Sequence, residues 1–147
     1  MEKVLLAAHV LAGILFVGPV AVTASLFPRY APVVGHPPGR GAPDRSVATA
    51  LHRVTRGYGV LALVVPVVGL LLAGVQGRLG EVWITVAMVL TAVAGGLLAL
   101  RVVPIQREAL EAPDDGTRLR GLRTLTGVFN LLWAVVVVLM VVRPGAA

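Results

Sequence analysis

The stretch that decides the fold is GYGVLALVVPVVGLLLAGVQGRLGEVWITVAMVLTAVAGGLLALRVV, residues 57–103. It holds two apolar segments, Gly57–Val75 and Val82–Val103, separated by the short polar loop Gln76–Glu81. Each segment is close to the roughly 20 apolar residues that a helix needs to cross about 30 Å of hydrocarbon. Both are apolar on all sides, as lipid-facing helices are. The short loop predicts that the two helices are antiparallel neighbours.

Two further apolar segments, Val4–Phe27 and Leu122–Val142, flank this pair. The first is longer than the ~7–15 residues of a signal-peptide core, which favours a retained helix over a cleaved leader. The sequence therefore predicts an all-α fold, a four-helix transmembrane bundle made of two antiparallel hairpins. We expect one integral membrane domain over residues 1–147, with helices at about 4–27, 46–75, 82–111 and 117–143.

Prolines and acidic residues mark the expected helix ends. Pro28 is predicted to end the first helix and Ala112-Pro113 the third, and the Pro- and Gly-rich stretch from Pro28 to Arg45 reads as an irregular loop. Pro19 and Pro66 lie inside the first and second helices and predict kinks. Capping side chains precede two of the helices: Asp44 or Ser46 before the second, and Asp114 or Asp115 before the fourth.

Composition and charge give the expected location. The chain is 57% hydrophobic and 14% charged, and it has no cysteine, which excludes disulfides, thiolate metal sites and cysteine nucleophiles. The net charge is +6, and ten of the 13 basic residues flank the first and third connections. The positive-inside rule then predicts that these connections are cytoplasmic and that both termini lie outside. Heavy use of Arg, Ala, Val, Gly and Pro indicates a GC-rich bacterial genome, hence the bacterial inner membrane, and no nucleic-acid partner is expected.

The sequence predicts a candidate ligand site at the end of the bundle where both chain termini lie. An ionisable residue within a membrane segment is a functional hypothesis by default, and His9 is such a residue. We predict that His9, Arg143 and Thr85 bind a cofactor, with Arg143 for a carboxylate and His9 as axial ligand of a haem or porphyrin. The alternative is an ordinary interfacial belt, in which His9 makes a local hydrogen bond and Trp83 anchors at headgroup depth. No catalytic residue and no metal site is predicted.

Other residues predict helix packing. Asn130 should face another helix, because an amide in hydrocarbon needs a partner. Thr85, Thr91 and Thr126 can return their hydroxyls to their own helices. A weak internal repeat pairs Phe27-Pro28-Arg29 with the Val103-Pro104 region, and both duplication and chance likeness stay open.

Small residues at four-residue spacing allow close helix contact: Ala8/Ala12, Gly69/Ala73/Gly77, Ala92/Gly96 and Gly95/Ala99.

Three short strings resemble a bacterial family of four-helix integral membrane proteins that has no established activity. They are His9-Val10-Leu11-Ala12-Gly13, Val103-Pro104-Ile105-Gln106-Arg107 and Leu139-Met140-Val141-Val142-Arg143-Pro144. More distantly, His9, Pro28-Arg29 and Arg143-Pro144 are similar to positions in HemJ-type protoporphyrinogen oxidases, which implies porphyrin chemistry. Arg143 stands where those enzymes have lysine, and arginine cannot release its proton as lysine can.

The expected function is that of a non-enzymatic membrane protein, either self-associating or an accessory subunit of a membrane complex. The alternative is a haem- or porphyrin-binding, or porphyrin-oxidising, membrane protein that uses His9. A small-molecule carrier is a third reading. The membrane segments hold no Asp or Glu, which disfavours a proton pump or an ion-coupled transporter. The expected partners are the lipid bilayer and a second copy or another membrane subunit.

Overall fold

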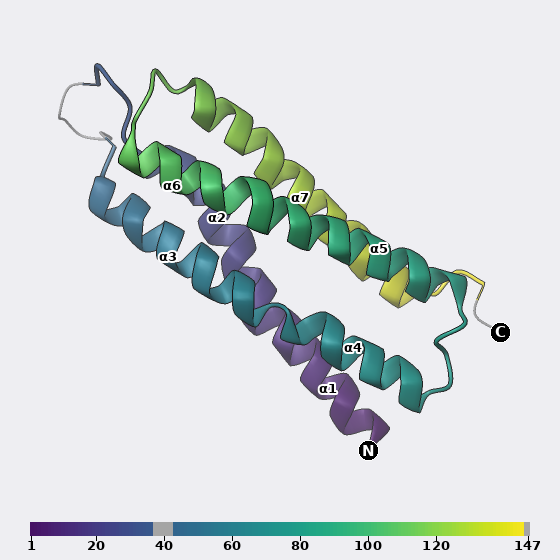
Figure 1. Cartoon of the computed structure of the whole chain (residues 1–147). Coiled ribbons are helices and arrows are strands. Elements are labelled where there is room, and N and C mark those ends of the chain that lie inside the picture. Colours follow the sequence, from purple (N-terminus) through teal and green to yellow (C-terminus); the bar gives the residue numbers. More distant parts are fainter. Residues whose placement is uncertain (37–42, 146–147) are drawn as a thin grey trace.

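The computed structural model describes residues 1–36 and 43–145, so the middle of the Pro- and Gly-rich loop, with Arg40, lies outside the described residues. Within these ranges the chain is helical and has no strand (Figure 1). Four spans are each long and apolar enough to cross a membrane, at Glu2–Tyr30, Arg45–Val75, Val82–Glu111 and Thr117–Val142. The predicted all-α four-helix bundle is confirmed.

The first and third spans each contain one widened turn. The first runs through α1 (Glu2–Ala12), a π-helical turn (Gly13–Val17) and α2 (Gly18–Tyr30). The third runs through α5 (Val82–Leu97), a π-helical turn (Leu98–Val102) and α6 (Val103–Glu111). Pro19 and Pro104 each follow the last π residue by two positions. A proline ring clashes with the carbonyl four residues earlier, and a wider turn moves that carbonyl away. Pro19 and Pro104 thus occupy equivalent positions, each just after a π-helical turn. The predicted internal repeat instead pairs Pro104 with Pro28.

The second span is broken and the fourth is not. The second consists of α3 (Arg45–Leu61) and α4 (Val64–Val75), with a non-α turn at Ala62 and Leu63. Pro66 has no N–H to offer the Ala62 carbonyl, which instead accepts from Val65 N at 3.0 Å. The kink that Pro66 predicts is therefore present. The fourth span is the continuous helix α7 (Thr117–Val142).

One predicted helix end is wrong. Pro28 lies inside α2, and the helix continues to Tyr30. It ends there because Ala31 precedes Pro32 and is extended, with φ −63° and ψ 139°. Asp44 caps α3 as predicted, because it accepts from the backbone N–H of Ser46 and of Val47. The N-cap of α7 is Gly116, not Asp114 or Asp115, although these two carboxylates accept from the backbone N–H of Arg118 at 3.1 Å and of Thr117 at 3.0 Å.

The hydrophobic core gathers in one half of the bundle, which we call the core end; it carries the first and third connections. Val20, Phe27, Val102 and Leu122, one or two from each of the first, third and fourth spans, are fully buried there. The other half, the termini end, carries both termini and the Gln76–Glu81 loop. Buried residues there form two separate contacts, one between α1 and α4 and one between α5 and α7.

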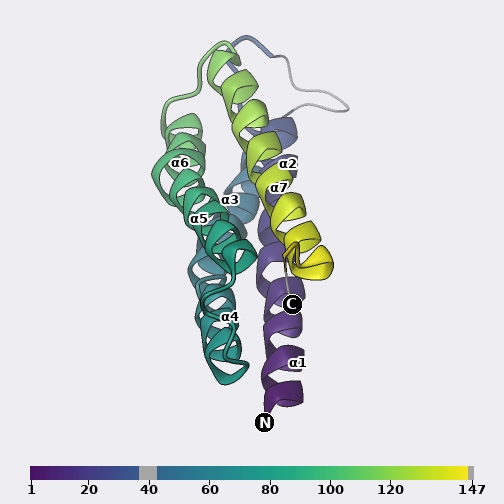
Figure 2. The ribbon, with the colours of Figure 1, turned by 90° about the vertical axis from the view of Figure 1, so that its right-hand side faces the viewer.

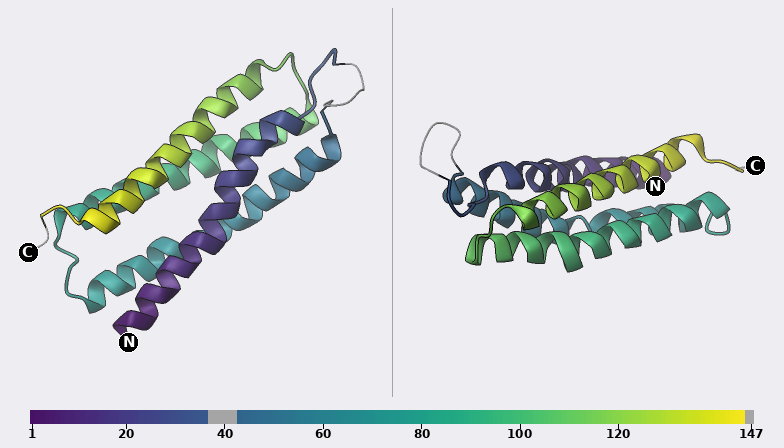
Figure 3. Two further views of the ribbon diagram at one scale, coloured as in Figure 1. Left: turned by 180° about the vertical axis from the view of Figure 1, so that it is seen from behind. Right: turned by 90° about the horizontal axis from the view of Figure 1, so that it is seen from above.

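The two helix pairs move apart toward the termini end. Figure 1 and the left view of Figure 3 show α1 and α4 diverging from α5 and α7, and in Figure 2 the lower ends of α1 and α4 extend beyond those of α5 and α7. Although the loop between α4 and α5 is short, these two helices make few contacts, while α2 packs closely on α3. Much of the outside of the bundle is apolar, with Leu100 75% and Val141 77% exposed, as expected of helices that face lipid, while charged residues such as Arg53 and Arg107 are exposed at the core end.

Candidate functional site: an apolar cavity between the helix pairs

A cavity of about 300 Å³ lies where the core ends and the helix pairs begin to separate. All four spans contribute to its wall, which includes Pro66 of α4, Gly95 and Gly96 of α5, and Phe129 and Trp133 of α7. No charged side chain lines it. The wall also includes Leu63, which is 61% exposed, so the cavity reaches the lipid-facing surface on the side of α4.

Small residues on α5 leave the cavity empty. A Cβ added at Gly95 or at Gly96 would meet no atom within 4 Å, so neither glycine is in close contact with another helix of this chain. Gly69 on α4 differs, because a Cβ there would lie 2.8 Å from His9 Cε1. The predicted close packing through small residues is therefore present at Gly69, inside the chain. Gly95 and Gly96 of α5 do not pack closely on another helix of this chain. Close packing at these two glycines stays a prediction for a contact with another molecule.

Two complementary polar atoms on α7 lack partners near the cavity. Asn130 donates through Nδ2 to Ser25 Oγ of α2 at 3.0 Å, which confirms that it faces another helix. Its Oδ1 is buried and accepts from no donor, and the buried Nε1 of Trp133, one turn further on, finds no acceptor in the described chain. Thr91, also in the wall, satisfies its hydroxyl on the Ala87 carbonyl at 2.7 Å, as predicted.

His9 contacts the neighbouring helix. Its ring is 9% exposed, and Nδ1 lies 3.0 Å from the Val65 carbonyl oxygen of α4. A carbonyl only accepts, so Nδ1 of His9 carries a proton and donates it to this bond. Gly69 lies one turn after Val65 and leaves room for the ring. His9 therefore joins α1 to α4, and it is not one of the residues that line the cavity.

The three residues predicted to bind a cofactor lie in three different settings. His9 is buried against α4, Thr85 is exposed on α5, and Arg143 is exposed just beyond the end of α7. Across residues 1–36 and 43–145, no hydrogen bond or ion pair joins any two of them. Haem or porphyrin binding by His9, Arg143 and Thr85 stays a prediction.

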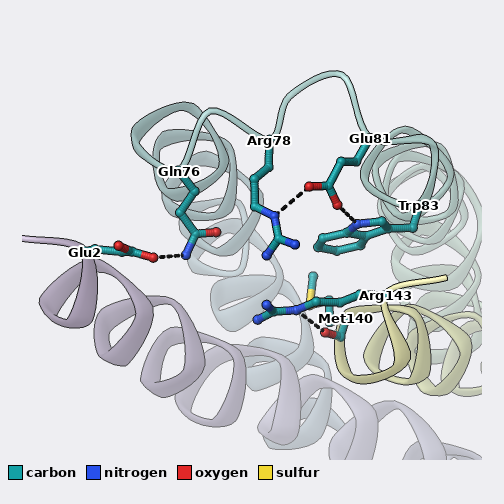
Figure 4. Close-up of polar contacts among 7 residues, drawn as sticks. All are labelled: Glu2, Gln76, Arg78, Glu81, Trp83, Met140 and Arg143. Atoms are coloured by element: carbon teal, nitrogen blue, oxygen red, sulfur yellow. Dashed lines mark hydrogen bonds and ion pairs between the residues drawn. The ribbon is translucent and has the colours of Figure 1, made fainter. Parts of the chain in front are cut away.

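Arg143 belongs instead to a polar cluster at the termini end (Figure 4). Glu81 accepts from Arg78 Nε at 2.6 Å through one oxygen and from the indole N–H of Trp83 through the other. The hydrogen bond from Arg78, the bond from Trp83 and the nearby positive charges of Arg78 and Arg143 lower the pKa of the Glu81 carboxyl. Sequence reasoning did not find Arg78, although the pattern Arg-x-x-Glu-x-Trp in a tight loop was a signal for it.

A second polar pair lies at the core end. Gln106 of α6 is fully buried, and its Oε1 is 3.1 Å from Nδ1 of His52 on α3. The Gln106 Nε2 atom is buried without an acceptor in the described part of the chain. This pair ties α3 to α6 below the core, away from the cavity. Nothing in the local sequence pattern links His52 to Gln106, so this pair was not predicted.

The fold and the cavity define a class: a four-helix bundle suited to a membrane, with an apolar pocket between two helix pairs. The described residues contain no cluster of His, Cys, Asp or Glu that could hold a metal ion. Comparison with protein-family models, with curated proteins and with solved structures found no match. The two family resemblances therefore stay predictions.

Proposed function

We propose that this chain is a non-enzymatic accessory protein of the bacterial inner membrane that binds a lipid acyl chain in the cavity between its helix pairs. The observation that carries the proposal is the cavity itself. Its volume of about 300 Å³ is at the lower end for ligand pockets. Its wall is almost wholly apolar, which suits a hydrocarbon chain and offers no group for acid–base chemistry.

The depth of the cavity agrees with a chain from one lipid leaflet. Trp133 in the cavity wall precedes Arg143 at the end of α7 by ten residues. At ~1.5 Å per residue this is about 15 Å, which is half of a hydrocarbon layer of about 30 Å. A chain that enters from the termini end therefore ends near the cavity. An empty apolar space of this size forfeits dispersion contacts that a chain would restore.

The orientation rests on the arginine distribution. Both termini lie outside the cytoplasm in this proposal, and the basic core end faces the cytoplasm. The chain has no cysteine, so single cysteines placed at Gly39 and at Gly145 are clean labelling sites. We expect a membrane-impermeant thiol reagent to label Gly145→Cys in intact cells and Gly39→Cys only after lysis. Labelling of both sites from the same side would refute this orientation.

A cavity-filling variant tests the function. Gly96→Phe places a ring in the cavity, while Gly127→Phe, on exposed α7 backbone with equally open surroundings, is the matched control. We expect native mass spectrometry in mild detergent to show bound lipid on wild type and Gly127→Phe, and much less on Gly96→Phe. Equal lipid retention by all three proteins would contradict the proposal.

The same samples separate the other readings. A dimer that Gly96→Phe dissociates would show that a second copy, not a lipid, occupies this side of the bundle. Another membrane protein that copurifies with wild type and is lost from Gly96→Phe would assign the side to a partner subunit. A Soret band in the absorbance scan that is lost in His9→Ala would favour haem binding instead.

A further inference from the structure

The termini end carries an excess of positive charge where the helix pairs separate. Arg78, in the loop after α4, and Arg143, at the end of α7, are nearest to a single carboxylate, that of Glu81. Arg78 uses Nε for Glu81, and Arg143 uses Nε for the Met140 carbonyl oxygen at 3.3 Å. Figure 4 shows the Arg143 side chain turned back along α7 toward the space below Arg78 and Trp83. Glu81 pairs directly with Arg78 alone, and the other carboxylate drawn there, that of Glu2, accepts from Gln76, so within the described residues the Arg143 guanidinium makes no ion pair.

Arg143 lies at the end of α7. α7 ends in a left-handed residue, a position that glycine usually takes. Here the residue is Arg143, with φ 47° and ψ 59°, and its N–H bonds to the Leu139 carbonyl oxygen at 2.9 Å. A non-glycine side chain in this conformation costs about 1 kcal/mol. The guanidinium folds back on α7, where Nε donates to the Met140 carbonyl oxygen, and it lies below Arg78 in Figure 4.

The charged cluster lies on the termini side of the cavity. Both involve α7 and the α4–α5 hairpin, and about 15 Å separates Arg143 from Trp133 along the helix. Phospholipids place an anionic phosphate about this far from the middle of the bilayer. Arginine binds phosphate oxygens through two parallel hydrogen bonds, and both guanidinium groups keep terminal nitrogens for this.

We propose that Arg78 and Arg143 bind the phosphate of an anionic phospholipid whose acyl chain occupies the cavity, so that the site selects anionic over zwitterionic lipid. This inference rests on the proposed function, because it assigns the headgroup of the same lipid. Glu81 orients Arg78 and competes with the phosphate for it. Removing Arg143 should therefore weaken binding, and neutralising Glu81 should strengthen it.

The two tryptophans lie at two depths in the membrane and can report lipid binding by fluorescence quenching. Trp133 is in the cavity wall and Trp83 is at the polar cluster, and the chain has only these two. A lipid brominated near the end of its acyl chain quenches a tryptophan that its chain end touches. The protein is reconstituted in phosphatidylcholine vesicles that contain a low fraction of brominated phosphatidylglycerol or, separately, of brominated phosphatidylcholine.

We expect the anionic lipid to quench Trp133 at about fivefold lower mole fraction than the zwitterionic lipid, a preference typical of one arginine near an anionic group. Arg143→Gln should abolish the preference, Arg143→Lys should keep most of it, and Glu81→Gln should increase it. Arg123→Gln, an exposed arginine of the same helix at the core end, is the control and should change nothing.

The possible results separate the two proposals. Equal quenching by both lipids in all variants would overturn the headgroup site and leave chain binding intact. Quenching by neither lipid would overturn chain binding as well. Glycerol phosphate that displaced the brominated lipid at equal concentration would show a site for the headgroup alone, and it would also overturn the inference.

Discussion

The two ends of this bundle differ both in composition and in packing, and the more apolar end is the less closely packed one. At the core end, residues of three or more spans meet around Phe27 and Leu122, both of which have no exposed surface. At the termini end the helices meet mainly in pairs, α1 with α4 and α5 with α7, and α4 and α5 make few contacts. Hydropathy is higher in α4 and α5 at this end than in α3 and α6 at the core end, so high hydropathy does not by itself close a membrane bundle.

Residue size and backbone breaks make the difference. Gly95 and Gly96 of α5 present no side chain to the facing helix, and Pro66 coincides with a break that redirects α4. In lipid there is no hydrophobic drive to bring helices together, so contact depends on van der Waals fit and polar bonds. At the termini end the helices fit closely within a helix pair, as His9 of α1 does against Gly69 of α4. Such a fit is missing between the α1–α4 pair and the α5–α7 pair.

The largest predicted effect is on the core. Phe27→Ala removes a fully buried ring from the core end and should lower the free energy of unfolding by about 3 kcal/mol. Leu131→Ala removes a side chain that is 64% exposed on the same bundle and should change it by less than about 0.5 kcal/mol. Reversible unfolding in mixed micelles of detergent and denaturant measures both. Equal losses would mean that the core end is not the better packed half.

A pair of glycine substitutions sharpens the comparison at the termini end. Gly69→Ala brings a Cβ against the His9 ring and should cost about 1–3 kcal/mol, because the ring must leave its bond to Val65. Gly96→Ala meets open space and should cost nothing or stabilise α5 slightly. The same unfolding assay applies, and the double variant Gly69→Ala/His9→Ala should lose less than the sum of the two single changes. Additive losses would argue against the contact.

The smallest effect is the pH dependence of the termini cluster. The pKa of Glu81 is lowered by Arg78, by Trp83 and by the charge of Arg143, so the folded state favours the carboxylate. That stabilisation is present above the ordinary value of 4.5 and is lost as the pH falls through the lower pKa of the folded protein. The melting temperatures of wild type and Glu81→Gln should therefore differ at neutral pH and converge in acid. If the difference in melting temperature did not depend on pH, the Arg78–Glu81 ion pair would not contribute to stability.

The sequence predicted the four helices, but it did not predict which helices pack together and where they separate. Apolar length fixed all four spans, and Asp44 and Pro113 marked ends correctly, because caps and X-Pro restrictions are local. Pro28 misled, since a proline inside a membrane helix can be accommodated and Pro32 was the true stop.

The candidate site was the less predictable part. His9 was a sound choice as a membrane histidine, but its partner is the Val65 carbonyl on another helix, which no local pattern encodes. The cavity depends on where α4 and α5 separate, and a short loop alone predicts that they stay together. Small-residue strips were visible in the sequence, yet only the structure shows that Gly69 is covered and Gly96 is open.

Quenching of Trp133 by chain-end brominated lipid, measured in wild type and in Gly96→Phe, is the most direct test of an open, lipid-accepting termini end. The cavity predicts strong quenching in wild type that Gly96→Phe largely removes, with Gly127→Phe unchanged. Trp133 that is shielded in wild type, or quenched equally in all three proteins, would show that no lipid chain enters between the helix pairs.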